Sequence, residues 1–158
     1  MQGTPIAEME WADFAAPIEN AVRSNFLTVK AAVPEMVRGG GGVVLFFGGN
    51  GDPVPNYSIG GFQVALHAVE TMRRQYSSEL GAQGVRFVTL RTGGIPDTIA
   101  DVMDGGEELA RSLSEATMTG RAATLEDVGA VAAFVASDKA RTMTAATVIV
   151  SAGALIDH

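Results

Sequence analysis

The chain of 158 residues contains no cysteine. Without cysteine it can form no disulfide framework and can offer no thiolate as a nucleophile or metal ligand. The absence fits a reducing compartment. The first residues, Met1 to Pro5, also lack the basic and apolar segments of a secretory signal. We therefore expect a cytoplasmic protein.

Positive charge is also scarce, with 11 Lys and Arg residues against 18 Asp and Glu and a net charge of -7. Nucleic acids and anionic membranes repel such a chain, so we expect neither as a partner. No apolar run approaches the roughly 18 residues of a membrane-spanning helix. A small neutral or cationic molecule is the ligand that this charge accommodates most easily.

What the sequence does contain is apolar and glycine-rich, with 47% hydrophobic residues and 19 glycines. This composition excludes disorder and favours a buried parallel sheet covered by helices. The length is sufficient for one globular domain, and no linker or internal repeat divides the chain. We expect a single domain over residues 1–158.

Apolar spacing predicts two long helices, Trp11 to Val37 and Ile59 to Leu80, the first interrupted near Pro17. Short apolar runs predict three buried strands: Val43 to Phe47, Arg86 to Leu90 and Thr147 to Val150. Strands separated by helices are joined by right-handed crossovers. The fold class is therefore α/β, a partial Rossmann-like parallel sheet of about three strands flanked by helices.

Three shorter helices are predicted in the second half of the chain, over Asp97 to Met103, over Glu107 to Ala116 and from Thr124 onward. We expect the free edge of the first strand to be covered, because its unpaired backbone N–H and C=O groups could otherwise pair with a strand of another chain. An N-terminal half lost from this chain, a second copy or the segment Met1 to Glu10 could provide it.

Three segments resemble one known family: Gly81 to Phe87, Gly120 to Val128 and Phe134 to Asp138. They are similar to the turn into the sixth strand, the following loop and helix, and the Phe-Leu-Ala-Ser-Asp signature of the short-chain dehydrogenase/reductases. The resemblance runs from about Trp11 to Leu155 and covers the C-terminal half of that family only. It implies a Rossmann fold and NAD(P)-dependent hydride transfer.

The catalytic positions of the family are not filled by catalytic residues here. Family members use a Ser, a Tyr as acid and base, and a Lys four residues later whose charge lowers the pKa of the Tyr. When Tyr76 to Leu80 sets the register, those positions hold Gly49, Phe62 and Leu66. Phe62 has no proton to transfer and Leu66 has no charge. We expect no catalytic residue in this chain.

The Asn that often completes the family's proton relay corresponds to Ala21, with Asn20 beside it. Tyr57 is a possible replacement acid, but no Lys follows it at a spacing of four. Its alternative is an ordinary loop tyrosine.

The family cradles the cofactor pyrophosphate in a Gly-rich turn that leads into a helix. The glycine cluster Gly48 to Gly51 leads instead into Asp52-Pro53, so NAD(P) is implied by the resemblance only and we expect no cofactor for this chain alone. The loop after the second strand resembles the family's nicotinamide-contacting loop. It supplies Gly93, Ile95 and Thr98 as cofactor-binding candidates. Their alternative is a turn that needs glycine, followed by a Thr near a helix start.

No metal site is expected. His67 and His158 are more easily explained as surface residues than as metal ligands. Five acidic residues around a Gly-Gly break are more typical of a solvated segment than of an acid/base pair: Asp97, Asp101, Asp104, Glu107 and Glu108.

These patterns predict a truncated homologue of the short-chain oxidoreductases without NAD(P)-dependent activity on its own. The alternative is a noncatalytic protein that self-associates as a scaffold or binds a small molecule. The resemblance implies dimer contacts through the two long helices, so we expect a homo-oligomer formed by residues 11–37 and 59–80.

Overall fold

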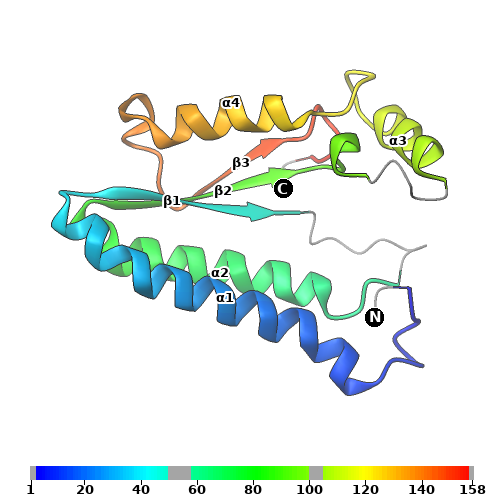
Figure 1. Cartoon of the computed structure of the whole chain (residues 1–158), viewed down its shortest axis with the longest axis horizontal. Coiled ribbons are helices and arrows are strands. Elements are labelled where there is room, and N and C mark those ends of the chain that lie inside the picture. The colour runs from blue at the N-terminus through cyan, green and yellow to red at the C-terminus, as the bar shows by residue number, and fades with distance from the viewer. Residues whose placement is uncertain (1–2, 50–57, 100–104, 157–158) are drawn as a thin grey trace. The chain divides into compact units, whose positions relative to one another are not determined.

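The structure is a computed structural model that describes residues 3–49, 58–99 and 105–156. It is an α/β fold in which helices flank a three-stranded sheet (Figure 1). The helices are α1 (Trp11–Arg38), α2 (Phe62–Leu80), α3 (Gly106–Glu115) and α4 (Leu125–Ala136). The strands are β1 (Gly42–Gly48), β2 (Val85–Thr92) and β3 (Ala146–Val150).

The sheet has the strand order β1-β2-β3 and is parallel, as the sequence predicts. The pairing of β2 with β3 places Val88 beside Ala146 and Thr92 beside Val150. β2 is the central strand, and its residues from Val85 to Leu90 are buried with the exception of Arg86. The expected α/β architecture of about three strands is confirmed.

The residues pack into two compact units. The first comprises Met1–Val44 and Asn50–Phe87, and the second comprises Leu45–Gly49 and Val88–His158. The expectation of one domain over residues 1–158 stays a prediction.

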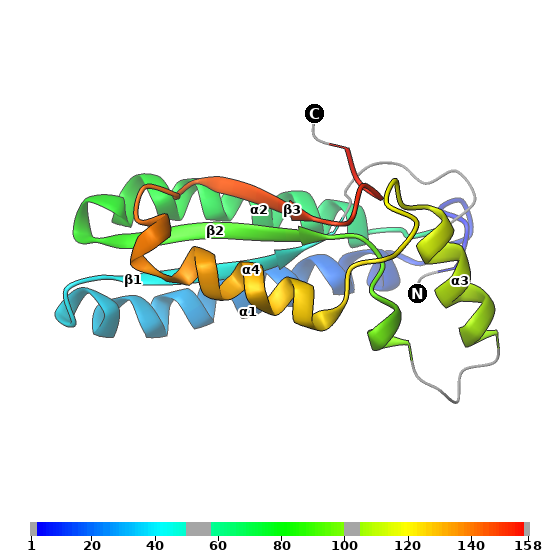
Figure 2. The same cartoon turned by 90° about the horizontal axis from the view of Figure 1, so that it is seen from above.

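In the first unit, α1 and α2 pack side by side (Figures 1 and 2). Both helices have buried apolar residues: Ala15, Val29 and Val33 on α1, and Ala65 and Val69 on α2. Gly61 permits the close approach, because a Cβ atom there would overlap the carbonyl oxygen of Phe14. The packing of these apolar stripes stabilises both helices.

The predicted interruption of the first helix near Pro17 is wrong, because α1 runs continuously through Pro17 and Pro34. Proline removes one helical hydrogen bond but does not prevent its neighbours from making theirs. α1 also has buried apolar residues and packs against α2, and both stabilise the helix. Tertiary packing outweighs the local cost of proline here.

Arg73 is a charged residue of α2 that the helix nevertheless buries. It is only 3% exposed. Its guanidinium Nη2 donates to Oε2 of Glu70 at 2.9 Å, one turn earlier on the same helix. A charged side chain can be buried in this way because its partner is buried with it.

The core of the second unit lies between α4 and the strands. It contains the buried residues Val88, Leu90, Val128 and Val135, with half-buried residues packed around them: Leu45, Ile95, Val131, Ala132, Met143, Val148 and Val150. Val128 and Val135 are seven positions apart, two turns of α4, so one face of the helix meets the sheet.

The shorter predicted helices have mixed outcomes. α3 agrees with the helix expected over Glu107 to Ala116, and α4 begins after Thr124 as expected. Of the helix expected over Asp97 to Met103, the structure has a single 3-10 turn, Pro96–Thr98, and residues 100–103 lie outside the described residues. None of the described helices is long and apolar enough to cross a membrane.

Candidate functional site

The start of α2 carries two of the three positions compared with the catalytic triad. Phe62 is the first residue of the helix and is 39% exposed, and Leu66 lies one turn later and is half-buried. A spacing of four places both on one helix face. The third position, Gly49, directly follows β1 in the second unit. Tyr57 lies outside the described residues.

The relay position, Ala21, lies within α1 and is half-buried. Its carbonyl oxygen accepts hydrogen bonds from Nδ2 of Asn25 at 2.8 Å and from Oγ of Ser24 at 3.3 Å. Asn20, beside it, is exposed and faces a cavity described below. The two neighbouring residues therefore have different surroundings, since only Asn20 lines the cavity.

The three cofactor-binding candidates lie in one loop after β2 in the second unit. A Cβ atom at Gly93 would lie 3.1 Å from Cβ of Ala154, so this position is closely packed. Ile95 packs against the core, and Oγ1 of Thr98 donates to the carbonyl oxygen of Ile95 at 2.7 Å. Each residue therefore has an internal structural role. A role for them in cofactor binding stays a prediction.

Asp97 ties this loop to the start of α4. Its Oδ2 accepts a hydrogen bond from the backbone N–H of Leu125 at 2.9 Å. Nothing in the local sequence indicated this contact, because the two residues are 28 positions apart. It fixes one end of the candidate loop to a capped helix.

The N-terminus of α4 is closed by a reciprocal capping box. The side chain of Thr124 accepts from the N–H of Asp127, and the Asp127 carboxylate accepts from the N–H of Thr124. Arg121 donates to the same carboxylate at 2.9 Å. The hydrogen bond from Arg121, followed by that from the backbone of Thr124, lowers the pKa of Asp127 to about 2. The carboxylate stays charged down to strongly acidic pH.

Tyr76 lies on α2 in the first unit. Its ring centroid is 5.7 Å from that of Phe87, in a tilted arrangement typical of buried aromatic pairs. Burial, and secondarily the charge of Glu79, raises the pKa of the Tyr76 hydroxyl. A phenol with a raised pKa is a poorer acid, which argues against a role for Tyr76 in proton transfer.

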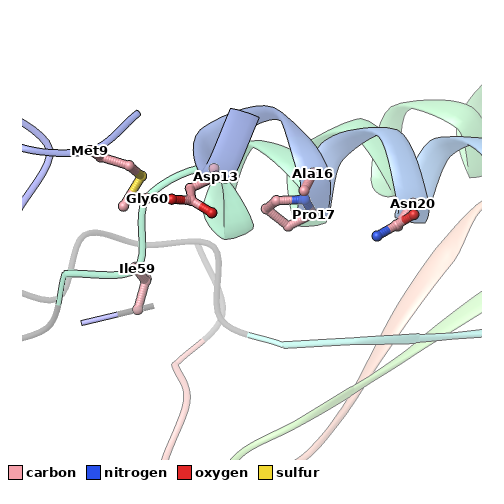
Figure 3. A pocket seen from close by; sticks show the side chains of 8 residues that line it. Met9, Asp13, Ala16, Pro17, Asn20, Ile59 and Gly60 are labelled. Carbon is pink, nitrogen blue, oxygen red and sulfur yellow. The ribbon is translucent and has the colours of Figure 1, made fainter. Parts of the chain in front are cut away.

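A cavity of about 310 Å³ opens between the first half of α1 and the segment before α2 (Figure 3). It lies wholly in the first unit. Its lining residues come from the chain before α1, from one side of α1 and from the turn into α2: Met9, Asp13, Ala16, Pro17, Asn20, Ile59, Gly60 and Gly61. Among these residues, the sequence pattern marked only Asn20 as a neighbour of a functional position, because the packing of the two helices brings the others together.

A second hollow, of about 500 Å³, lies along β3 and the turn after it. Ser151 is buried at this turn, and its Oγ accepts from the N–H of Leu155 at 3.1 Å. The hydroxyl therefore stabilises the turn.

Within residues 3–49, 58–99 and 105–156, no group of three or more His, Asp or Glu residues is placed to hold a metal ion. His67 is exposed on α2. Asp101, Asp104 and His158 lie outside the described residues.

A family model described as enoyl-(acyl carrier protein) reductase matches residues 1–154. The chain belongs to this family of short-chain dehydrogenases/reductases. The resemblance read from its sequence is thereby confirmed.

Two relatives illustrate the membership. The enoyl-(acyl-carrier-protein) reductase (NADH) FabI of Nostoc sp. is 32% identical over 142 residues, which are 90% of this chain and 54% of that protein. Dehydrogenase/reductase SDR family member 4 of Sus scrofa is 28% identical over 84% of this chain and 47% of its own length. The chain thus spans about half the length of the curated relatives it matches.

The solved structures agree on the fold. The enoyl-(acyl-carrier-protein) reductase of Anaplasma phagocytophilum, in complex with NAD, superimposes with a TM-score of 0.82 at 23% identity. The match covers 96% of this reductase-family chain and 57% of that one. At this identity the likeness establishes the fold alone.

The described residues do not fit the pyrophosphate of a dinucleotide. A pyrophosphate site needs free N–H groups at a helix N-terminus. The first turns of three helices instead carry carboxylates: Asp13 on α1, Glu107 and Glu108 on α3, and Glu126 and Asp127 on α4. At the start of α2, the space beside Gly61 is occupied by the Phe14 carbonyl oxygen. Each of these groups repels an anion.

Proposed function

We propose that this chain is a reductase-family protein that does not transfer hydride from NAD(P)H by itself. The observation that carries the proposal is the pair Phe62 and Leu66 on one face of α2, at the positions compared with the family's acid and cation. A phenyl ring has no exchangeable proton, and a leucine cannot lower the pKa of a neighbouring acid. The carboxylates at the helix N-termini support the same conclusion.

A turnover assay tests the proposal. The purified chain is mixed with NADH or NADPH and a short enoyl thioester, and cofactor absorbance is followed with and without the thioester. We expect no thioester-dependent oxidation. Oxidation that scales with enzyme concentration and saturates with thioester overturns the proposal. Loss of that oxidation in Tyr57→Phe would then identify Tyr57 as the acid.

A second candidate function is self-association through α1 and α2 as a noncatalytic protein. Large apolar side chains are exposed on these helices: Trp11, Phe26, Leu27, Phe62 and Val64. Trp11 is 74% exposed. Apolar side chains gathered on a surface are typical of protein interfaces.

Sedimentation at several concentrations tests this second candidate. Phe26 and Phe134 are each 48% exposed, the first on α1 and the second on α4, so they form a matched pair. We expect oligomers that Phe26→Lys weakens and Phe134→Lys does not. A monomer at all concentrations removes this candidate.

We also propose a cytoplasmic location, supported by the absence of cysteine and the acidic composition. Cell fractionation with an antibody to the chain tests it. Recovery in an extracytoplasmic fraction would contradict it.

A further inference from the structure

Arg91 on β2 is a half-buried cation without a counter-charge among the described residues of the chain. Its Nε atom is buried and has no hydrogen-bond partner there. Arg91 also belongs to none of the ion pairs that the described residues form. A buried donor of this kind is normally completed by a bound water, ion or ligand, because burial removes its hydration.

Arg91 lies on the face of the sheet opposite α4, near the carboxyl end of β2. The preceding residue, Leu90, packs in the core with α4, and side chains alternate between the two faces of a strand. The parallel register places Arg91 beside Ile149 on β3. Val148 packs toward α4 as well, so Ile149 and Arg91 project from the same face.

The hollow along β3 therefore adjoins Arg91, because Ile149 is one of the residues that line it, together with Thr147, Ser151 and Leu155. Its volume of about 500 Å³ falls within the range, roughly 300–1,000 Å³, that small-molecule sites occupy. The described residues that line it are all uncharged. All of them belong to the second unit, as Arg91 does. Arg91 thus supplies a cation at the border of an uncharged, partly apolar hollow.

The turn after β3 adds backbone donors to this hollow. Ala152 and Gly153 have φ angles of 53° and 84°, and the N–H of Ala154 closes the turn by donating to the carbonyl oxygen of Ser151 at 3.0 Å. That bond does not use the N–H groups of Ala152 and Gly153, which both line the hollow. A Cβ atom at Gly93 would lie 3.5 Å from Cβ of Ser151, so the ends of β2 and β3 meet here (Figure 1). Ligands of open α/β sheets bind at such carboxyl ends.

The charge beside the hollow differs in sign from the charge of the whole chain. The net charge of -7 favours neutral or cationic ligands. Exposed charges more than about 10 Å apart are largely screened in 0.1 M salt, so the nearest charged group decides which ion a site prefers. A guanidinium group pairs with a carboxylate through two parallel hydrogen bonds. A doubly charged phosphate would meet only this one cation, so a carboxylate is the better match.

We propose that the hollow beside Arg91 binds a small carboxylate with an unbranched apolar chain. The carboxylate pairs with the Arg91 guanidinium, and the N–H groups of the turn after β3 provide further donors. The hydrocarbon chain lies along Ile149 and Leu155. The site does not depend on whether the chain transfers hydride, because it uses neither Phe62 nor Leu66.

Hexanoate is the test ligand, with hexanamide as the uncharged match and hexylammonium as the cation. Calorimetric titration in low-salt buffer measures affinity, and the methyl resonances of Ile149 and Leu155 report the place of binding. We expect saturable binding of hexanoate, with shifts at both side chains. Binding of hexanamide and of hexylammonium should be at least about tenfold weaker, since neither makes a charge-assisted bond to Arg91.

Two variants separate the site from the general charge of the chain. Arg91→Met removes the cation beside the hollow, and Arg141→Met removes an exposed cation of the same unit. We expect Arg91→Met to weaken hexanoate binding about tenfold or more and Arg141→Met to leave it unchanged. Arg91→Lys keeps the charge but loses the paired donors, so its affinity should lie between those of Arg91→Met and the unchanged chain.

Ligand-free stability provides a separate readout. Arg91→Met removes a buried donor that has no partner, so thermal unfolding without ligand should occur at the same or a higher temperature. Hexanoate should then raise the unfolding temperature of the unchanged chain and of Arg141→Met, but not that of Arg91→Met.

Three outcomes overturn the proposal. One is absence of saturable hexanoate binding to the folded chain, which would leave water as the partner of Arg91. Another is equal affinity for hexanoate and hexanamide, and the third is equal loss of affinity in Arg91→Met and Arg141→Met. If Arg91→Met fails to fold, the Arg91→Lys variant and the comparison with hexanamide decide the question.

Discussion

The carboxylate of Asp97 accepts a hydrogen bond from the backbone N–H of Leu125 at 2.9 Å, across 28 positions of sequence. This bond joins the loop after β2 to the first turn of α4. The N–H groups at a helix start have no partner within the helix, so an acceptor from elsewhere stabilises both segments. Asp97 thus holds in place the loop that contains Gly93, Ile95 and Thr98.

Asp97→Ala is expected to lower the free energy of unfolding by about 1 kcal/mol, the typical cost of losing a cap at a helix start. Asp97→Asn keeps an acceptor oxygen in nearly the same place and should cost less. Urea titration of the three proteins measures the difference. Equal stability of Asp97→Ala and the unchanged chain would show that the bond contributes nothing in solution.

Thr124→Ala removes the side chain that caps the same helix start. The expected loss of stability is about 0.5–2 kcal/mol, because the N–H of Asp127 loses its acceptor. Thr142→Ala, at an exposed position after α4, serves as the control and should change stability by less than about 0.5 kcal/mol. Thermal unfolding of both variants checks the ranking, and the reverse ranking would contradict the capping assignment.

The Arg121–Asp127 pair predicts a pH dependence. The pKa of Asp127 is about 2 in the folded chain against 3.8 for an ordinary aspartate. A carboxyl group whose folded pKa is lowered adds stability above its unfolded pKa and loses that contribution as pH falls through the folded value. The stability gap between the unchanged chain and Asp127→Asn should therefore be constant above about pH 5 and shrink between about pH 4 and 2.

An NMR titration of the Asp127 side-chain carbonyl checks the cause of this shift. Arg121→Ala should move the midpoint upward, toward the ordinary range, because the largest stabilising partner of the carboxylate is gone. An unchanged midpoint would assign the shift to Thr124 alone.

The buried pair on α2 gives a fourth prediction. Glu70→Gln leaves the guanidinium of Arg73 buried without its counter-charge, which is expected to cost about 3–5 kcal/mol. The double change Glu70→Leu with Arg73→Met should cost less than Glu70→Gln, since it removes both charges together. Arg74→Met, at an exposed neighbouring position, is the control. Chemical unfolding measures the set, and a double variant that is no more stable than Glu70→Gln would contradict the assignment of a buried charge pair.

The regular elements of this fold could be predicted from residue pattern. The apolar runs around Leu45, Val88 and Val148 identify the strands, and the Thr124 to Asp127 segment identifies a helix start, because each signal lies within a few residues. Contacts between distant residues could not be predicted in this way. The sequence gives no sign of the bond from Leu125 to Asp97, and it gives no sign that Arg73 and Glu70 are buried together.

The candidate site likewise has features that the sequence predicts and features that it does not. Once the family resemblance sets the register, the sequence alone identifies Phe62 and Leu66 at the positions of the family's Tyr and Lys. The cavity at Asp13 is not visible there, because it forms only when the turn at Gly60 and Gly61 packs against α1. Pro17, which predicted an interruption of the first helix, lies within the continuous helix α1.

Calorimetric titration of NADH into the purified chain tests the central claim most directly, because it measures cofactor binding without assuming a substrate. The carboxylates at the helix N-termini and the crowded space at Gly61 predict no saturable heat up to about 1 mM NADH, which corresponds to a binding free energy weaker than about -4 kcal/mol. Saturable binding of one NADH per chain with a micromolar dissociation constant would contradict the claim that this chain works without the cofactor of its family.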